Sequence, residues 1–125
     1  MAAKVGKQQL TGSGGRNVGP GEFSYGVGEA LYSTSLWPSL AQALSQAEDG
    51  NGAALLQLND EYLERGPDGY ANLIEANLAV NCVDRPWPTP VPPYHALPAK
   101  VARPFPRLGP APAPRQRVCA PEFSS

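Results

Sequence analysis

The side chains that could carry covalent chemistry in this sequence are few and widely separated. Ser24 lies in the run Glu22-Phe23-Ser24-Tyr25-Gly26, which has the serine and the final glycine of a nucleophile elbow. That strained strand-to-helix turn needs a small residue where Glu22 stands and an apolar strand before it, whereas a glycine-proline loop precedes Ser24 here. Ser24 is therefore a weak candidate nucleophile, and an ordinary loop serine is the favoured interpretation.

His95 is the only histidine in the chain, and it lies among prolines at Pro92, Pro93 and Pro98. A catalytic triad needs its base hydrogen-bonded to the nucleophile and to an orienting acid. Nothing near His95 in the sequence suggests these partners, so we interpret it as a solvated loop histidine. One histidine and two distant cysteines make no ligand cluster, and we expect no metal and no cofactor.

Composition excludes several classes of function. The 125 residues allow one domain at most, and 10 basic against 11 acidic residues leave no basic stripe for nucleic acid. No apolar run is long enough to span a membrane, and the N-terminal residues lack the apolar core of a signal peptide. We therefore expect neither a nucleic-acid partner nor a membrane partner.

Glycine and proline divide the chain into three segments. Eight of 13 glycines fall in residues 1–28, and 12 of 15 prolines fall at Pro86 or later. The sequence predicts a flexible N-terminal segment over 1–26, a helical cap-like unit over 27–85 and a proline-rich extension over 86–125. The predicted fold class is mainly α, with helical signals that begin near Val27.

Two helices near residues 36–48 and 52–65 are predicted to form an antiparallel αα-hairpin. Pro38 suits the first turn of the earlier helix, Gly50 ends it, Asn51 can cap the later helix, and Gly66-Pro67-Asp68-Gly69 has turn chemistry. The apolar residues recur at helical spacing on each segment. The predicted buried set is Trp37, Leu40, Leu44, Leu55, Leu58 and Tyr62.

The segment from Tyr70 to Cys82 fits two periodicities. Its apolar residues alternate as in a half-buried strand, yet several also lie at helical spacing, and its Leu, Glu and Ala content favours a helix, which Asn72 can cap. We favour the helix. From Arg85 onward the prolines predict extended backbone, with a faint helical pattern over Ala96–Arg107 that further prolines interrupt.

Several passages together resemble the helical middle of the tripeptidyl-aminopeptidase-like α/β-hydrolases, secreted bacterial serine peptidases of the prolyl-aminopeptidase clan. The resemblance runs from about Leu10 to Ala120, and it lies in the order and spacing of short motifs. These motifs are Ala30-Leu31-Tyr32, Trp37-Pro38-Ser39-Leu40-Ala41, Glu48-Asp49-Gly50-Asn51-Gly52, Asp68-Gly69-Tyr70, Ala79-Val80-Asn81-Cys82-Val83-Asp84 and Val118-Cys119-Ala120.

The resemblance implies that this chain is an internal cap, or lid, fragment of a secreted serine exopeptidase. In that family the nucleophile elbow lies upstream of this region, and the acid and the histidine lie downstream of it. The fragment would then meet a peptide substrate only together with a catalytic core that it does not contain. A secreted parent also favours a disulfide between Cys82 and Cys119, the alternative being two free thiols.

An exopeptidase cap must bind a free α-amine, which requires a carboxylate that faces the cleft. By position in the resembling passage, Glu75 and Asp84 are the candidates. The alternative interpretation is that Glu75 lies on a solvated helix face and that Asp84 caps a turn.

A second function from a different class remains open at this stage. The chain could be a small helical protein-interaction module whose proline-rich tail binds aromatic-lined grooves. Pro88-Thr89-Pro90 and the alternating prolines from Pro110 to Pro114 would be the binding segments.

Overall fold

The computed structural model describes residues 2–84 and 92–104, and it is mainly helical, as predicted. Its contacts divide the chain into two compact units, Met1–Ala71 and Asn72–Ser125. Among the described residues, no helix has both the length and the apolar character that crossing a bilayer requires.

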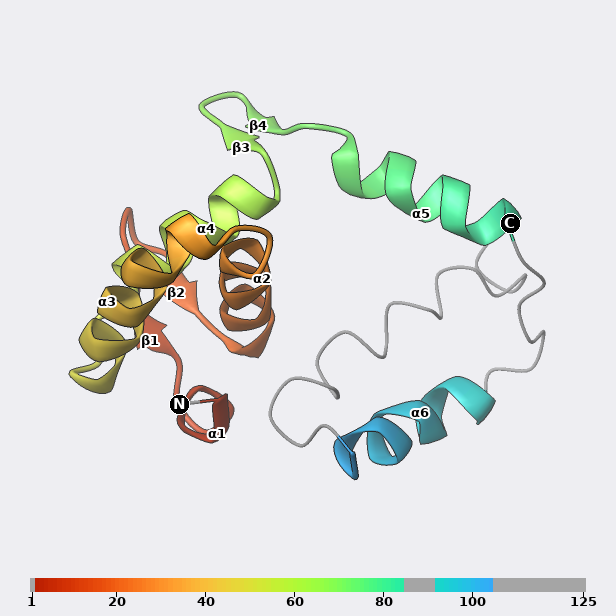
Figure 1. Ribbon diagram of the computed structural model, residues 1–125, viewed down its shortest axis with the longest axis horizontal. Helices are drawn as coiled ribbons and strands as arrows, with labels where there is room; N and C mark the ends of the chain where they lie inside the picture. Colours follow the sequence, from red (N-terminus) through yellow and green to blue (C-terminus); the bar gives the residue numbers. More distant parts are fainter. Residues whose placement is uncertain (1, 85–91, 105–125) are drawn as a thin grey trace. The chain divides into compact units, whose positions relative to one another are not determined.

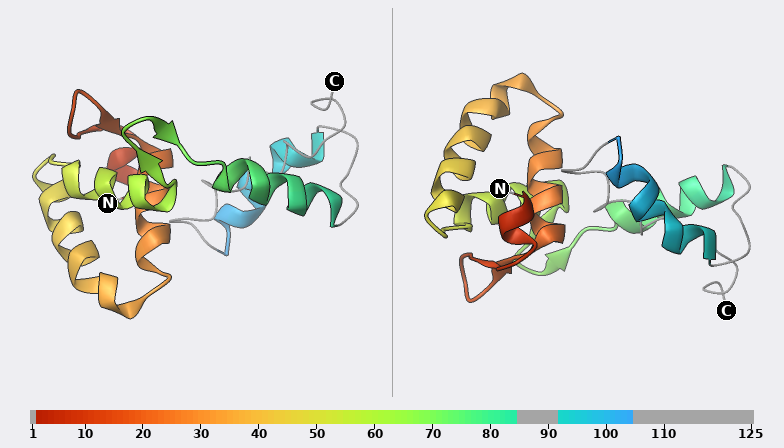
Figure 2. Two further views of the ribbon diagram at one scale, coloured as in Figure 1. Left: turned by 90° about the horizontal axis from the view of Figure 1, so that it is seen from above. Right: turned by 90° about the horizontal axis from the view of Figure 1, so that it is seen from below.

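The first unit is built on three helices, α2 (Pro20–Ala30), α3 (Trp37–Glu48) and α4 (Ala53–Tyr62), which Figure 1 and Figure 2 show side by side. A short 3₁₀ turn, η1 (Thr34–Leu36), leads into α3. Helix α1 (Ala2–Val5) and the antiparallel pair β1 (Leu10–Thr11) and β2 (Asn17–Val18) complete the N-terminal part.

The sequence predicts a flexible segment over residues 1–26, but the described residues 2–26 contain α1, the β1–β2 pair and the first turns of α2. Helix α2 begins at Pro20, whose missing N–H costs nothing in a first turn, and not near Val27. The Glu22 carboxylate accepts a hydrogen bond of 2.9 Å from the Gly19 N–H and so satisfies one backbone donor at the start of α2. Gly26 and Gly28, two of the eight glycines in residues 1–28, lie inside this helix, and the small size of Gly26 permits close packing against α4.

Helices α2 and α4 form the centre of the first unit. A Cβ added to Gly26 would lie 2.6 Å from the Leu55 carbonyl oxygen, so the two backbones are in direct contact. Leu55 and Leu56 are fully buried. The other buried apolar residues are Val5, Leu10, Val18, Phe23, Val27, Ala30, Ala43, Ala47 and Leu58.

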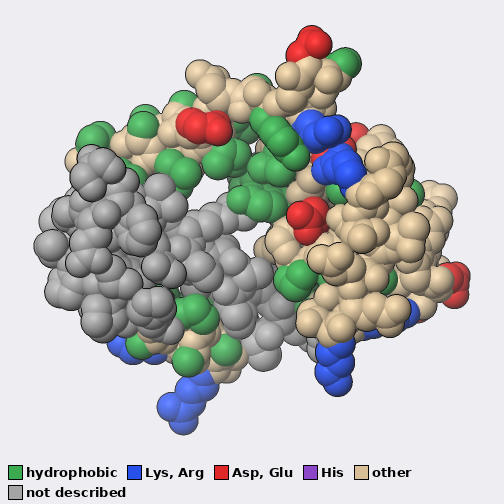
Figure 3. Space-filling model, turned by 180° about the vertical axis from the view of Figure 1, so that it is seen from behind, with side chains coloured by type: hydrophobic (Ala, Val, Ile, Leu, Met, Phe, Trp, Pro, Cys, Tyr) green, Lys and Arg blue, Asp and Glu red, His purple; other side chains and the backbone are tan. Residues whose placement is uncertain are grey.

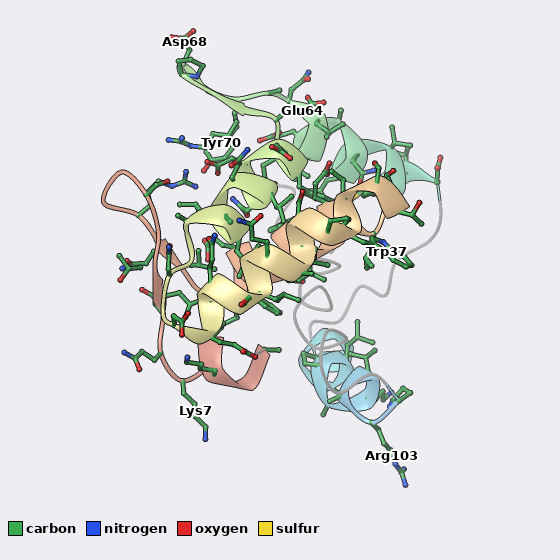
Figure 4. The ribbon with its side chains drawn as sticks, turned by 60° about the vertical axis from the view of Figure 1, so that its left-hand side comes forward. Lys7, Trp37, Glu64, Asp68, Tyr70 and Arg103 are labelled. Carbon is green, nitrogen blue, oxygen red and sulfur yellow. The ribbon has the colours of Figure 1, made fainter. Side chains whose placement is uncertain are left out.

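The predicted helical hairpin is present, but its buried face differs from the prediction. Helix α3 contacts α4, and Figure 4 shows the two helices alongside each other. Leu55 and Leu58 are buried as predicted, whereas Trp37 is 55% exposed. The predicted residues Leu40, Leu44 and Tyr62 are only half-buried. Ala43 and Ala47 are buried instead, because α3 approaches its neighbours on its small residues.

The link between α3 and α4 follows the predicted turn chemistry. Gly50 has a φ of +90°, a conformation that glycine adopts without strain. The Asn51 side chain accepts a hydrogen bond of 3.0 Å from the Ala53 N–H at the start of α4. The backbone of Thr11 in β1 pairs with this link, by accepting from the Gly52 N–H at 2.7 Å and donating to the Gly50 carbonyl at 3.1 Å.

After α4 the chain forms a second antiparallel pair, β3 (Arg65–Gly66) and β4 (Gly69–Tyr70), and Figure 4 shows Asp68 at its tip. This pair occupies the predicted turn.

The second unit contains the predicted helix of residues 70–82, which is α5 (Leu73–Val83) with Asn72 at its N-cap. It also contains α6 (Pro92–Ala102). The prediction of extended backbone is wrong at Pro92 and Pro93, because they occupy the first turn of α6, and Pro98 is accommodated inside that helix. Both proposed groove-binding segments, Pro88-Thr89-Pro90 and Pro110 to Pro114, lie outside the described residues.

Candidate functional site

Ser24 does not lie on a nucleophile elbow. It is half-buried within α2, on regular helix, whereas an elbow serine projects from a sharp turn between a strand and a helix. Glu22, which stands where the elbow needs a small residue, is the residue that caps α2. The sequence feature that weakened Ser24 as a candidate is therefore a helix-capping signal.

Glu75 and Asp84 are placed at opposite ends of α5. Glu75 lies in the first turn and Asp84 is the C-cap, and both side chains are exposed. Nine residues of helix separate them by about 13 Å along the axis and put them on opposite faces. The structure therefore does not bring the two carboxylates together on one site.

The other predicted site residues are only partly described. The backbone of His95 lies in α6, and its side chain is outside the described part. Cys82 is half-buried in the last turn of α5, whereas Cys119 lies outside the described residues, so their pairing stays a prediction. Within residues 2–84 and 92–104, no group of three or more His, Cys, Asp or Glu side chains could hold a metal ion.

The structure does bring together a charged cluster that the sequence did not predict. Arg16, from the loop between β1 and β2, donates two hydrogen bonds to the Asp60 carboxylate of α4, at 2.6 and 2.8 Å. Arg65 of β3 lies 4.0 Å from the same carboxylate, and its guanidinium lies 5.6 Å from the centre of the Tyr70 ring. Figure 4 shows Tyr70 at the end of α4. The cluster ties β1–β2 and β3–β4 to one helix.

The electrostatics of this cluster favour the charged forms of its members. The hydrogen bonds from Arg16 hold the pKa of Asp60 below its usual value, against the opposing effect of partial burial. The same bond raises the pKa of Arg16. No local sequence signal could have found this pair, because its partners are 44 residues apart and neither lies in a motif.

Asn59, next to Asp60, is almost completely buried between α2 and α4. Its side-chain N–H donates to the Asp60 carboxylate at 3.1 Å, while its Oδ1 is buried without a hydrogen-bond partner among the described residues. The side chain thus helps to orient Asp60 from inside the core.

Two neighbouring depressions run along the α3–α4 surface. One, of about 320 Å³, lies between α3 and α4, and the other, of about 660 Å³, opens toward Arg65. Glutamine and glutamate side chains supply most of their polar groups, and Gln57 and Glu61 line both and are hydrogen-bonded to each other at 3.1 Å. This surface can offer hydrogen bonds to a polar ligand, and the described side chains that line it include no histidine.

The ring of Tyr62 contacts two tyrosines, Tyr25 of α2 and Tyr32 just after it, with the ring planes tilted by 46° and 42°. The ring of Tyr62 lies 5.0 Å from that of Tyr25 and 6.1 Å from that of Tyr32, measured between ring centres. Repulsion from Tyr62 is the main reason that the pKa of Tyr32 is raised above its ordinary value. Tyr32 was noted in the sequence only as part of a motif, and its stacking on Tyr62 depends on the α2–α4 packing.

Comparison with known proteins gives one consistent relationship. The chain is 47% identical over 58 residues to proteins named serine protease Hip1 from Mycobacterium bovis and from two strains of Mycobacterium tuberculosis. The match covers 46% of this chain and 11% of each mycobacterial protein, so the chain spans only about a tenth of the length of these relatives. No family model matches the chain. The identity over these 58 residues supports a relationship between this chain and serine proteases.

Proposed function

We propose that this chain is the cap segment of a serine hydrolase of the tripeptidyl-aminopeptidase type. In this proposal it shapes the substrate entrance over a catalytic body that carries the nucleophile, the acid and the base. The observation that carries the proposal is the 47% identity to a serine protease over a segment that makes up only 11% of that protease. A match to so small a share of the related protease favours the interpretation that this chain corresponds to one part of such an enzyme.

The geometry of the first unit supports a role as a cap more than a role in catalysis. Ser24 lies on regular helix, and the described side chains that line the α3–α4 surface are chiefly glutamines and carboxylates, with no nucleophile beside a base among them. Covalent acyl transfer needs an activated nucleophile, an oriented base and an oxyanion hole. A compact helical unit can instead exclude water and select peptides by shape and hydrogen bonding at the cleft.

The substrate and location follow from the same proposal. The substrate is a peptide with a free N-terminus, whose amine is met by a carboxylate on the cap. Because Glu75 and Asp84 lie at opposite ends of α5, only one of them can take this role. The parent enzyme acts outside the cytoplasm, where a bond between Cys82 and Cys119 would persist.

A hybrid enzyme tests the proposal. The matched 58 residues of the M. tuberculosis protein are replaced by their counterpart in this chain, and hydrolysis of a small activated ester is compared with that of chromogenic tripeptides. We expect ester hydrolysis to be retained, because the triad is untouched, and the ratio of tripeptide to ester kcat/KM to change. An unchanged ratio, or loss of ester hydrolysis in a folded hybrid, would contradict a cap role.

The isolated 125-residue chain provides the complementary measurement. We expect it to hydrolyse neither the ester nor the tripeptides above the buffer rate. Turnover that disappears in both Ser24→Ala and His95→Ala variants would contradict the cap proposal and make Ser24 a nucleophile.

A further inference from the structure

The link between α3 and α4 contains the one asparagine–glycine pair of the sequence, Asn51-Gly52. This pair is chemically labile, because glycine has no side chain to keep its backbone nitrogen away from the preceding asparagine. The nitrogen of Gly52 loses its proton and attacks Cγ of Asn51, and the side-chain amide leaves with a proton as ammonia while a five-membered succinimide closes. Water then opens this ring at either carbonyl, which gives aspartate or isoaspartate. Every other asparagine of the sequence precedes a residue with a side chain.

The fold requires both residues of this reactive pair. A Cβ on Gly52 would lie 2.8 Å from Cγ2 of Val18 and 3.0 Å from Cβ of Leu10, so only glycine fits against the β1–β2 pair. The Asn51 side chain accepts the Ala53 N–H at 3.0 Å and so satisfies a backbone donor at the start of α4. Packing and turn chemistry therefore place a labile pair at this link.

Strand β1 holds the nucleophile of the reaction. The Gly52 N–H donates to the Thr11 carbonyl at 2.7 Å, and the Thr11 N–H donates to the Gly50 carbonyl at 3.1 Å. The short bond from Gly52 must break before its nitrogen can lose a proton and turn toward Asn51. Gly52 is buried, whereas Asn51 is exposed and open to water. The structure thus withholds the attacking nitrogen and not the carboxamide.

Charge does not promote the reaction at this asparagine. Basic and acidic side chains are interspersed on the face of the molecule that Figure 3 shows, and the whole chain has a net charge of −1. The charged residues just before the link, Glu48 and Asp49, are acidic and oppose the loss of a proton from a nearby nitrogen. The hydrogen bond from Gly52 to β1 is therefore the feature that controls the rate.

We propose that Asn51-Gly52 is a latent deamidation site that strand β1 keeps closed. The reaction requires β1 to leave the link, and its two products differ in effect. An aspartate at position 51 can still accept the Ala53 N–H, and its charge suits the start of a helix. Isoaspartate adds a methylene group to the backbone, so Thr11 can no longer pair with Gly50 and Gly52 together. Deamidation thus makes the opening of β1 irreversible. This proposal does not depend on the hydrolase assignment.

Incubation of the whole chain at mildly alkaline pH, with and without concentrated guanidinium chloride, tests the proposal. Peptide mapping by mass spectrometry follows the replacement of the Asn51 side-chain NH₂ by OH, and chromatography separates aspartate from isoaspartate peptides. We expect the folded chain to react at least about tenfold more slowly than the denatured chain, because reaction must await local opening. Asn17-Val18 is the internal control, since its branched side chain should keep it slow in both solutions.

Two leucine truncations separate the opening of β1 from unfolding of the whole unit. Leu10→Ala removes a buried β1 side chain next to Gly52, and Leu58→Ala removes a buried α4 side chain that lines the depression between α3 and α4. With urea titrations to compare the variants at equal global stability, Leu10→Ala should accelerate deamidation of the folded chain more than Leu58→Ala. Leu10→Val is the milder substitution if Leu10→Ala does not fold.

Three results would overturn the latent-site proposal. The first is deamidation at Asn51 that is as fast in the folded chain as in the denatured chain, because β1 would then give no protection. The second is an acceleration by the Leu10 variants no greater than that by Leu58→Ala at equal stability. The third is a denatured chain in which Asn51 reacts no faster than Asn17.

Discussion

Gly26 of α2 lies directly against the Leu55 carbonyl of α4, so closely that a Cβ at position 26 would be 2.6 Å from that oxygen. The contact lets the backbones of the two helices touch at the centre of the first unit. It also explains why a glycine is placed in the interior of a helix, where glycine costs about 1 kcal/mol relative to alanine.

The substitution Gly26→Ala should therefore destabilise the first unit by about 1–3 kcal/mol, because the new methyl group forces the helices apart. Gly28→Ala is the matched control in the same helix, since its Cβ would lie 3.7 Å from the Tyr62 ring, an ordinary contact. It should stabilise by about 0.5–1 kcal/mol through helix propensity. Urea unfolding followed by circular dichroism measures both. Equal effects of the two substitutions would contradict the close α2–α4 contact.

The bond between Arg16 and Asp60 predicts an acid-sensitive contribution to stability. The pKa of Asp60 is lowered in the folded chain, chiefly by the hydrogen bonds from Arg16. The pKa of an aspartate in an unfolded chain is about 3.9. The carboxylate thus contributes stability above about pH 4, and this contribution is lost as the pH falls through the folded pKa.

Asp60→Asn should lower the unfolding free energy at pH 6 by about 1 kcal/mol, the scale of a partly exposed ion pair with good geometry. The difference from the parent should shrink as the pH is lowered below about 4. Asp68→Asn, at the exposed tip of the β3–β4 hairpin, removes the same charge without this partner. Urea titrations at a series of pH values make the comparison, and a pH-independent difference would argue against the assignment.

Burial separates the leucines of the predicted core into two groups. Leu55 is fully buried, so Leu55→Ala should lower the free energy of unfolding by about 2–5 kcal/mol. Leu44 is half-buried, so Leu44→Ala should lower it by only about 1 kcal/mol. Chemical denaturation of the two variants gives both values. If Leu44→Ala lowered the free energy of unfolding as much as Leu55→Ala, the result would support the buried α3 face that the sequence predicts.

The sequence predicts what is local in this fold. Turn chemistry and helix propensity within a few residues explain three features. These are the end of α3 just before Gly50, the hydrogen bond that the Asn51 side chain accepts from the Ala53 N–H, and the helix of residues 73–83. The packing of α2 against α4 could not be predicted from such local signals. Periodicity shows which face of a helix is apolar, but not that Gly26 allows α2 to occupy the central position. The glycine-rich composition of residues 1–26 instead predicted a flexible segment.

The same distinction applies to the candidate site. Glu22 argued locally against Ser24 as a nucleophile, because a small residue is needed at that position of an elbow. In the structure, the Glu22 carboxylate instead accepts a hydrogen bond from the Gly19 N–H at the start of α2. The Arg16–Asp60 pair required a long-range approach of β1–β2 to α4, which no spacing in the sequence encodes. Glu75 and Asp84 were grouped by their place in a resembling passage, but regular helix separates residues nine apart onto opposite faces.

A disulfide between Cys82 and Cys119 is the last prediction. These are the only two cysteines, and the proposed extracytoplasmic parent supplies an oxidising environment. Closing this loop should stabilise the chain by roughly 3–4 kcal/mol in the chain-entropy model. Mass spectrometry of oxidised protein should show the loss of one hydrogen pair, and proteolysis without reductant should yield a peptide that links the two residues. The variant Cys82→Ala/Cys119→Ala should melt like the reduced parent. Two freely alkylated thiols after refolding in air would contradict the bond and weaken the proposal of a secreted parent.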